Sequence, residues 1–174
     1  MEQNKSALLV GVGGQGAILV AKILVGGLMK AGYDVKMSEV HGMSQRGGSV
    51  STQVHWGKKV YSPVIGDAAA DIVVSFEKME AVRYANYLKK DGVAVINDFE
   101  MPSSTIAAGL VEYPAGCMEA MEKHFRVLKL DAGNDLMVAE YTMPSYMNKE
   151  DAEKVLPHLR KISYRWDGAR FVRE

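Results

Sequence analysis

A glycine-rich segment near the N-terminus has the spacing of a phosphate-binding loop. Residues 11–16 read G-V-G-G-Q-G, the pattern G-x-G-x-x-G, between an apolar run and a segment with helical periodicity. In such a loop Gly11 permits a tight turn, Gly13 leaves room for a ligand, and Gly16 lets the helix pack on the strand. The N–H groups that open the helix favour a phosphate. The candidate binding or interface residues are Gly11, Gly13, Gly14, Gln15 and Gly16, although the same glycines also suit a tight turn without a nucleotide.

A second polar segment follows the next predicted strand. Residues 41–50 read H-G-M-S-Q-R-G-G-S-V, and a polar loop at the carboxyl edge of an α/β sheet is where such folds usually place function. We expect it to lie beside residues 11–16, so that the two loops form one concave, hydrogen-bonding surface. Its candidate ligand or interface residues are Ser44, Gln45, Arg46, Gly47 and Gly48.

The charged residues of this region each have two interpretations. Arg46 offers a guanidinium fork for a phosphate or carboxylate, or it forms a structural salt bridge, for example with Glu39, that holds the loop. Glu39 lies where a ribose-binding acid would stand in a dinucleotide site. His41 is better explained as a packed or hydrogen-bonded loop residue than as a catalyst.

Two nucleophile-bearing motifs are weaker. Residues 42–46 nearly match the hydrolase elbow G-x-S-x-G around Ser44, but Arg46 replaces the last glycine, and no well-placed later Asp-then-His order completes a triad. Cys117 begins a predicted helix, whose dipole would favour the thiolate. The alternative for Cys117, a buried structural cysteine, is preferred.

Composition restricts the function further. The chain has 174 residues, 48% of them hydrophobic, and Lys plus Arg (21) balances Asp plus Glu (21). This predicts a packed domain with no electrostatic preference for nucleic acid or anionic membranes. The single cysteine excludes an intramolecular disulfide and an iron–sulfur cluster ligated by the cysteines of this chain alone. The histidines lack close ligand spacing, so no metal site is predicted. Without a predicted span or signal peptide, a cytoplasmic location is expected.

Apolar runs alternate with helical patterns, as in a largely parallel α/β sheet. The predicted fold class is therefore α/β, a Rossmann-like three-layer sandwich. Strands are expected at residues 7–12, 33–40, 49–56, 71–76, 93–97 and 125–130. Helices are expected at 15–31, 77–90 and from Asn148 onward, with Gly32 and Gly92 as stops for the first two. Glu77, Glu80 and Arg83 have helical spacing and indicate a solvated or interface helix face.

With these segments taken together, the chain resembles the gamma domain of pyruvate:ferredoxin oxidoreductases, the pyruvate/ketoisovalerate oxidoreductase gamma type. In particular it resembles the beta subunit of indolepyruvate:ferredoxin oxidoreductase. The resemblance runs from about residue 6 to about residue 98 and implies one gamma-type domain over residues 1–174. It is carried by residues 11–16, 39–48, 61–65, 70–73 and 80–83.

The resemblance implies one subunit of an enzyme that oxidatively decarboxylates a 2-oxoacid to an acyl-CoA and passes electrons to ferredoxin. Thiamine diphosphate and iron–sulfur clusters are then held by partner subunits and none by this chain, which would contribute to assembly and to the coenzyme A side of the active site. The isolated chain is expected to be inactive. It is expected to form a homodimer, because a subunit without its complex exposes apolar surface.

Two other functions remain open at this point. The glycine loop would suit an independent oxidoreductase that binds NAD or a flavin, and the fold would also suit a non-catalytic scaffold module. The subunit interpretation is preferred because the Q-R-G-G tract has no role in an independent dinucleotide-binding enzyme.

Overall fold

The computed structural model describes residues 4–41, 47–102, 104–132, 136–142, 161–166 and 171–173. The strands are β1 (Lys5–Val12), β2 (Asp34–His41), β3 (Ser49–Gly57), β4 (Ala70–Ser75), β5 (Leu88–Asn97), β6 (Arg126–Ala132), β7 (Leu136–Thr142), β8 (Lys161–Trp166) and β9 (Phe171–Arg173). The helices are α1 (Ala17–Lys30), α2 (Lys78–Arg83), the short 3₁₀ helix η1 (Ala85–Tyr87), α3 (Ser104–Ala107) and α4 (Cys117–His124).

Across the described ranges the strands form one mixed sheet in the order β2-β3-β1-β4-β5-β6-β7-β8-β9. At its centre β1, β4, β5 and β6 run parallel. On one side of this centre, β3 pairs antiparallel with both β1 and β2. On the other side, the pairs from β6 to β9 are all antiparallel. The β2–β3 connection is too short for the dozen or more residues that a parallel crossover requires, which explains the antiparallel pairing on that side.

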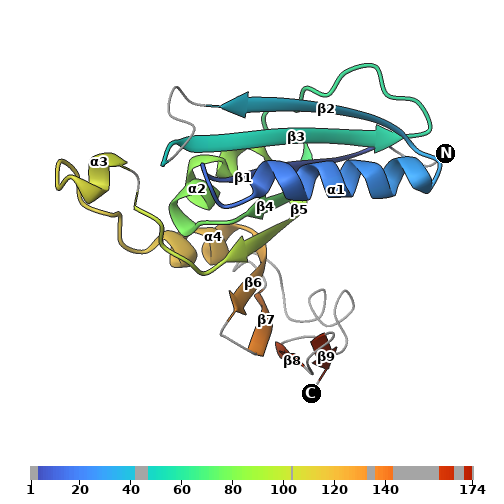
Figure 1. Cartoon of the computed structure of the whole chain (residues 1–174). Helices are drawn as coiled ribbons and strands as arrows, with labels where there is room; N and C mark the ends of the chain where they lie inside the picture. The colour runs from blue at the N-terminus through green and yellow to red at the C-terminus, as the bar shows by residue number, and fades with distance from the viewer. Residues whose placement is uncertain are drawn as a thin grey trace.

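Helices cover both faces of the sheet centre, as Figure 1 shows for α1 lying along β1 and β3. On the α1 side, Ala7, Leu9 and Val54 pack with Ala21 of the helix. On the opposite side, Leu8, Val73 and Ile96 belong to a second cluster together with residues of α2 and α4. β1 is buried on both faces, as expected for a central parallel strand. The predicted three-layer α/β arrangement is confirmed.

The second predicted helix is wrong in its extent. Residues 77–90 were expected to be helical up to Gly92, but α2 ends at Arg83 and β5 begins at Leu88. The register against β4 shifts between Ala70 and Ile72, so the extra residues of β5 form an irregularity in the ladder. A Cβ on Gly92 would lie 2.5 Å from Cδ1 of Leu88. Pairing with β4 therefore places residues 88–90 in a strand in spite of their local helical pattern. Gly92 is not a helix stop; it lies in β5, where it leaves room for the Leu88 side chain.

The other predicted elements agree with the structure where it describes them, but α3 and the strands β7, β8 and β9 were not predicted. Gly32 follows α1 with a φ of 89°, the left-handed conformation that ends many helices. The helix expected from Asn148 lies outside the described residues. Of the helices in the described ranges, none is long and apolar enough to span a membrane.

Asp71 ties the start of β4 to β1 and β5. Its carboxylate accepts hydrogen bonds from the Ser6 N–H at 2.8 Å, from Lys5 Nζ at 3.2 Å and from Lys89 Nζ. Burial alone would raise the pKa of Asp71, but the hydrogen bonds from Lys89, the Ser6 amide and Lys5 outweigh it and hold the pKa below its ordinary 3.8. The charged form of Asp71 therefore stabilises the fold.

We predict that Asp71→Asn lowers the free energy of unfolding at pH 7 and that this difference from the wild type shrinks in acid. A depressed pKa in the folded state contributes stability above the pKa of the unfolded chain, and that stability is lost as the pH falls through the folded pKa. Urea denaturation at pH 7 and below pH 4 measures both differences. Asp91→Asn, at an exposed position, is the control and should change little. An Asp71→Asn deficit that is the same at both pH values would contradict the prediction.

Candidate functional site

The glycine loop and the end of the second polar segment lie side by side. The N–H of Gly13 donates to the carbonyl of Gly48 at 2.7 Å, and the N–H of Gly47 donates to the carbonyl of Gly13 at 3.3 Å. These bonds continue the antiparallel ladder beyond the Val12–Ser49 pair of β1 and β3. The predicted adjacency of the two loops is thus confirmed for the described residues. Ser44, Gln45 and Arg46, and any contact of Arg46 with Glu39, lie outside them, as does the side chain of His41.

Two glycines of the first loop, Gly11 and Gly16, have roles that differ from the predicted ones. Gly11 lies within β1 and makes no tight turn. A Cβ there would meet Oε1 of Gln15 at 2.9 Å and Cβ of Phe76 at 3.1 Å. Gly16 has a φ of 83°, and a Cβ on it would meet nothing within 4 Å. Gly11 is therefore required for close approach, and Gly16 for its left-handed backbone at the start of α1 rather than for packing.

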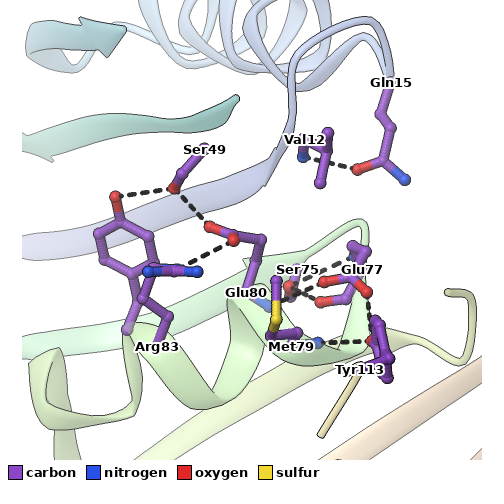
Figure 2. A network of polar contacts seen from close by, with 10 residues as sticks. Val12, Gln15, Ser49, Ser75, Glu77, Met79, Glu80, Arg83 and Tyr113 are labelled. Carbon is purple, nitrogen blue, oxygen red and sulfur yellow. Dashed lines mark hydrogen bonds and ion pairs between the residues drawn. The ribbon is translucent and has the colours of Figure 1, made fainter. Parts of the chain in front are cut away.

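Gln15 joins the ends of β1 and β4. Its Oε1 accepts from the N–H of Val12 at 2.7 Å (Figure 2). Its Nε2 donates to the carbonyl of Phe76 at 2.9 Å. Because α1 follows β1 on one face of the sheet and α2 follows β4 on the other, this junction is the topological switch point, where doubly wound folds bind dinucleotides. Here a side chain of the protein itself bridges the crevice.

A cavity of about 510 Å³ opens beside this junction, on the α1 side of the glycine loop. Its lining includes Gly13, Gly14 and Gly16 of the loop, Lys22 of α1 and Glu39 of β2. No side chain among the described residues caps the N-terminus of α1, and its first turn contains no acid. The N–H groups there are thus suited to an anionic group.

Lys22 and Glu39 provide the charged side chains of this cavity lining. Lys22 Nζ lies 3.6 Å from Glu39 Oε1, and the Lys22 side chain is 60% exposed. Glu39 lies near the end of β2, as predicted, and it lines the same cavity as the glycine loop. An exposed lysine at the N-terminal half of α1 adds positive charge to that of the helix end.

Two buried carboxylates lie on the other side of the sheet, where the sequence indicated a solvated or interface helix face. Glu77 is 0% exposed and Glu80 is 1% exposed, so the prediction for these two residues is wrong. Glu80 accepts from the hydroxyl of Ser49 and, at 3.0 Å, from Nε of Arg83 (Figure 2). Arg83, the third member of the predicted face, has a half-exposed side chain. Sequence periodicity identified the helix but gave no signal of the distant hydroxyl partner that permits burial of Glu80.

Glu77 forms the N-cap of α2 and holds the loop that precedes α4. Its Oε2 accepts from the N–H of Glu80 at 2.9 Å, and its Oε1 accepts from the hydroxyl of Tyr113. Burial, together with the hydrogen bond to Glu77 and its charge, raises the pKa of the Tyr113 phenol well above its ordinary range. Tyr113 Oη also accepts from the N–H of Met79 at 3.1 Å. This phenol therefore remains a neutral, hydrogen-bonded structural group.

Cys117 begins α4, as predicted, beside a second cavity of about 420 Å³. The side chain is buried, and its Sγ donates to the carbonyl of Pro114 at 3.3 Å. Burial and the Glu77 carboxylate raise the pKa of the thiol, which opposes thiolate formation. The structural interpretation of Cys117 is thus supported. The described residues contain no group of His, Cys, Asp and Glu arranged to hold a metal ion.

The chain is similar to several known proteins. It is 41% identical over 130 residues to indolepyruvate oxidoreductase subunit IorB of Thermococcus kodakarensis, and it spans only 62% of that relative's length. Pyruvate oxidoreductase subunit PORC of Thermotoga maritima has a similar structure, with a TM-score of 0.53 and 16% identity over 74% of this chain and 62% of that one. The 2-oxoglutarate:ferredoxin oxidoreductase of Magnetococcus marinus, solved with 2-oxoglutarate, coenzyme A and succinyl-CoA bound, matches 67% of this chain and 19% of its own with a TM-score of 0.50 and 20% identity.

At these identities the two solved structures support the fold. The family model described as pyruvate ferredoxin/flavodoxin oxidoreductase matches residues 6–145. It therefore extends well past residue 98, where the resemblance seen in the sequence ends. Since this match covers most of the chain, the chain belongs to the pyruvate ferredoxin/flavodoxin oxidoreductase family as a gamma-type domain.

Proposed function

We propose that this chain is the small subunit of a multisubunit 2-oxoacid:ferredoxin oxidoreductase, of the kind that acts on indolepyruvate. The observation that carries the proposal is its 41% identity to a subunit of indolepyruvate oxidoreductase within a shared family. In the assembled enzyme a 2-oxoacid is decarboxylated and oxidised to an acyl-CoA, and ferredoxin takes the electrons. The isolated chain is expected to be inactive.

The redox groups of such an enzyme belong to partner subunits. Clusters require several cysteine ligands, and this chain has only Cys117, which is buried against Pro114. The residues of this chain therefore do not fit a cysteine-ligated iron–sulfur cluster. Thiamine diphosphate and the clusters are assigned to the partners, and α1 offers a surface for assembly. Leu19 and Ile23 are exposed on that helix, and in the isolated chain the same surface would favour a homodimer.

The glycine-loop cavity is the part of this chain that we assign to coenzyme A. Coenzyme A carries phosphate groups, and the open N-terminus of α1 together with Lys22 supplies backbone donors and a cation for one of them. Gly13 and Gly14 leave the approach free of side chains. The coenzyme A in the solved 2-oxoglutarate:ferredoxin oxidoreductase is consistent with this assignment. Gly47 and Gly48 hold the loop edge against Gly13.

Binding of NAD or a flavin is less well supported. A dinucleotide would be expected at the switch point between β1 and β4, where Gln15 already bridges Val12 and Phe76. A scaffold role without catalysis would leave the cavity unexplained. Both alternatives predict a chain that is purified without a thiamine-containing partner.

Affinity purification of this chain from its native cells without oxygen tests the proposal. We expect co-purification of a brown, thiamine-containing complex that reduces a dye when both a 2-oxoacid and coenzyme A are supplied. An aryl pyruvate should be the preferred substrate in a panel with pyruvate, 2-oxoglutarate and a branched-chain oxoacid. Recovery of the chain alone, with no such activity, would contradict the proposal and make nucleotide binding the next measurement.

In the purified complex, Lys22→Ala is predicted to raise the KM for coenzyme A by about threefold to tenfold, because about 1.4 kcal/mol corresponds to a factor of ten and exposed charged contacts contribute less than that. The KM for the 2-oxoacid should not change. Lys30→Ala, at the other end of the same helix, is the matched control. Equal effects of the two substitutions would mean that Lys22 does not contact coenzyme A.

A further inference from the structure

The buried carboxylate of Glu80 reaches from α2 to the first residue of β3. Its Oε2 accepts the hydroxyl proton of Ser49, and Oη of Tyr84 lies 3.3 Å from the same Oγ. Since Ser49 gives its only hydroxyl proton to Glu80, Tyr84 must be the donor in that second contact. The result is a chain of hydrogen bonds from Tyr84 through Ser49 to Glu80. Figure 2 shows Ser49 and Glu80 pointing toward each other, away from Gln15.

Ser49 is the first residue after the two glycines that pair with Gly13. Gly47 has a φ of 75°, and neither Gly47 nor Gly48 has a side chain to anchor it. The position of Gly47 and Gly48 therefore depends on their backbone hydrogen bonds to Gly13 and on the interactions that fix the neighbouring Ser49. The one described side chain that accepts the Ser49 proton is Glu80, 31 residues away.

Burial of this carboxylate is costly enough to need a reason. Removing a carboxylate from water is strongly unfavourable unless well-aligned partners compensate. Both oxygens of Glu80 do have partners, Ser49 and Arg83, but the Arg83 side chain is 52% exposed and could pair with an acid at the surface equally well. The contact that requires burial is the one to Ser49.

We propose that Glu80 is a positioning residue for the glycine-loop cavity. Through Ser49 it fixes Gly47 and Gly48 against Gly13, which lines the cavity, and thereby holds the glycine loop in the position that receives the phosphate-bearing ligand. This inference rests on the proposed function, because that ligand is taken to be coenzyme A. Glu80 touches neither ligand nor reacting atoms, so its effect is on ligand affinity rather than on the chemical step.

Glu77 gives a matched comparison on the same helix. It too is buried and also accepts a hydroxyl hydrogen bond, but from Tyr113, on the side of α2 away from the loop. Ser49→Ala and Tyr113→Phe thus each remove one hydroxyl from one buried glutamate. A general loss of stability would appear in both variants, whereas a positioning effect would appear only in Ser49→Ala.

The experiment compares Ser49→Ala, Glu80→Leu and Tyr113→Phe in the purified complex. We expect Ser49→Ala and Glu80→Leu each to raise the KM for coenzyme A about fivefold or more, with the KM for the 2-oxoacid and kcat at saturating coenzyme A unchanged. Tyr113→Phe should leave all of them unchanged, and Ser49→Thr, which keeps the hydroxyl, should restore the wild-type value. The double variant should be no worse than the more severe single one, because both remove the same contact.

Amide hydrogen exchange in the same complexes separates the two proposals. We expect faster exchange at Gly13 and Gly47 in Ser49→Ala and Glu80→Leu but not in Tyr113→Phe. Unchanged exchange together with an unchanged KM, while Lys22→Ala still raises the KM, would overturn the role of Glu80 and leave the coenzyme A assignment intact. Faster exchange with no change in the KM in any variant, Lys22→Ala included, would overturn the coenzyme A assignment and, with it, this inference.

Discussion

Leu9→Ala is expected to lower the free energy of unfolding by about 2–5 kcal/mol, the range for truncating a buried leucine. Leu9 is 1% exposed in the middle of β1 and packs with Ala7, Ala21 and Val54 under α1. Ala21, which is completely buried, already brings the helix close to the sheet, so little material is available to fill the vacated space. Urea denaturation of the full chain measures the difference.

Leu110→Ala is the control for this prediction. Leu110 lies outside α1 and its side chain is 75% exposed, so the substitution should change stability by no more than about 0.5 kcal/mol. A loss of less than about 1 kcal/mol for Leu9→Ala would mean that this face of the sheet is not tightly packed. Comparable losses for both leucines would mean that the loss at Leu9 does not come from its burial under α1.

The centre of the fold was predictable because the local pattern of apolar residues there indicates both the element type and its burial. The apolar run at residues 7–12 has no polar alternation, which indicates a strand covered on both faces, and β1 is covered by α1 on one side and α2 on the other. The periodicity of residues 15–31 correctly gave α1. The nearness of the two glycine loops also followed from strand order at one edge of the sheet, and the bonds of Gly13 confirm it.

The errors occur where distant residues decide the structure. Helical spacing of Glu77 and Glu80 correctly indicated α2 but implied exposure, because nothing nearby in the sequence reveals Ser49 or Tyr113 as hydrogen-bond partners. Similarly, Leu88 continues a helical pattern locally but pairs with Ala70 of β4. The roles of the individual glycines also depend on contacts across the fold, as Gly11 demonstrates.

Gly11→Val is expected to destabilise the protein by about 1–3 kcal/mol through overpacking, with a further loss of about 1–3 kcal/mol if the Val12 N–H is left without its partner. A Cβ at this position would stand 3.1 Å from Cβ of Phe76, which is fixed to the backbone, and 2.9 Å from Oε1 of Gln15. Gln15 can move away only by giving up its 2.7 Å hydrogen bond to Val12. Urea denaturation and amide exchange at Val12 measure the two effects.

The sign of the stability change in Gly11→Val distinguishes local strand propensity from close packing at this position. Gly11 lies in β1 without a positive φ, and valine favours strands by up to about 1 kcal/mol, so local propensity alone predicts that Gly11→Val stabilises the protein. Close approach predicts the opposite. Gly66→Val is the matched control, since a Cβ on Gly66 meets nothing within 4 Å. If Gly11→Val were neutral or stabilising, the bridge between β1 and β4 through Gln15 would not require glycine, and a side chain at the switch point would be compatible with the site.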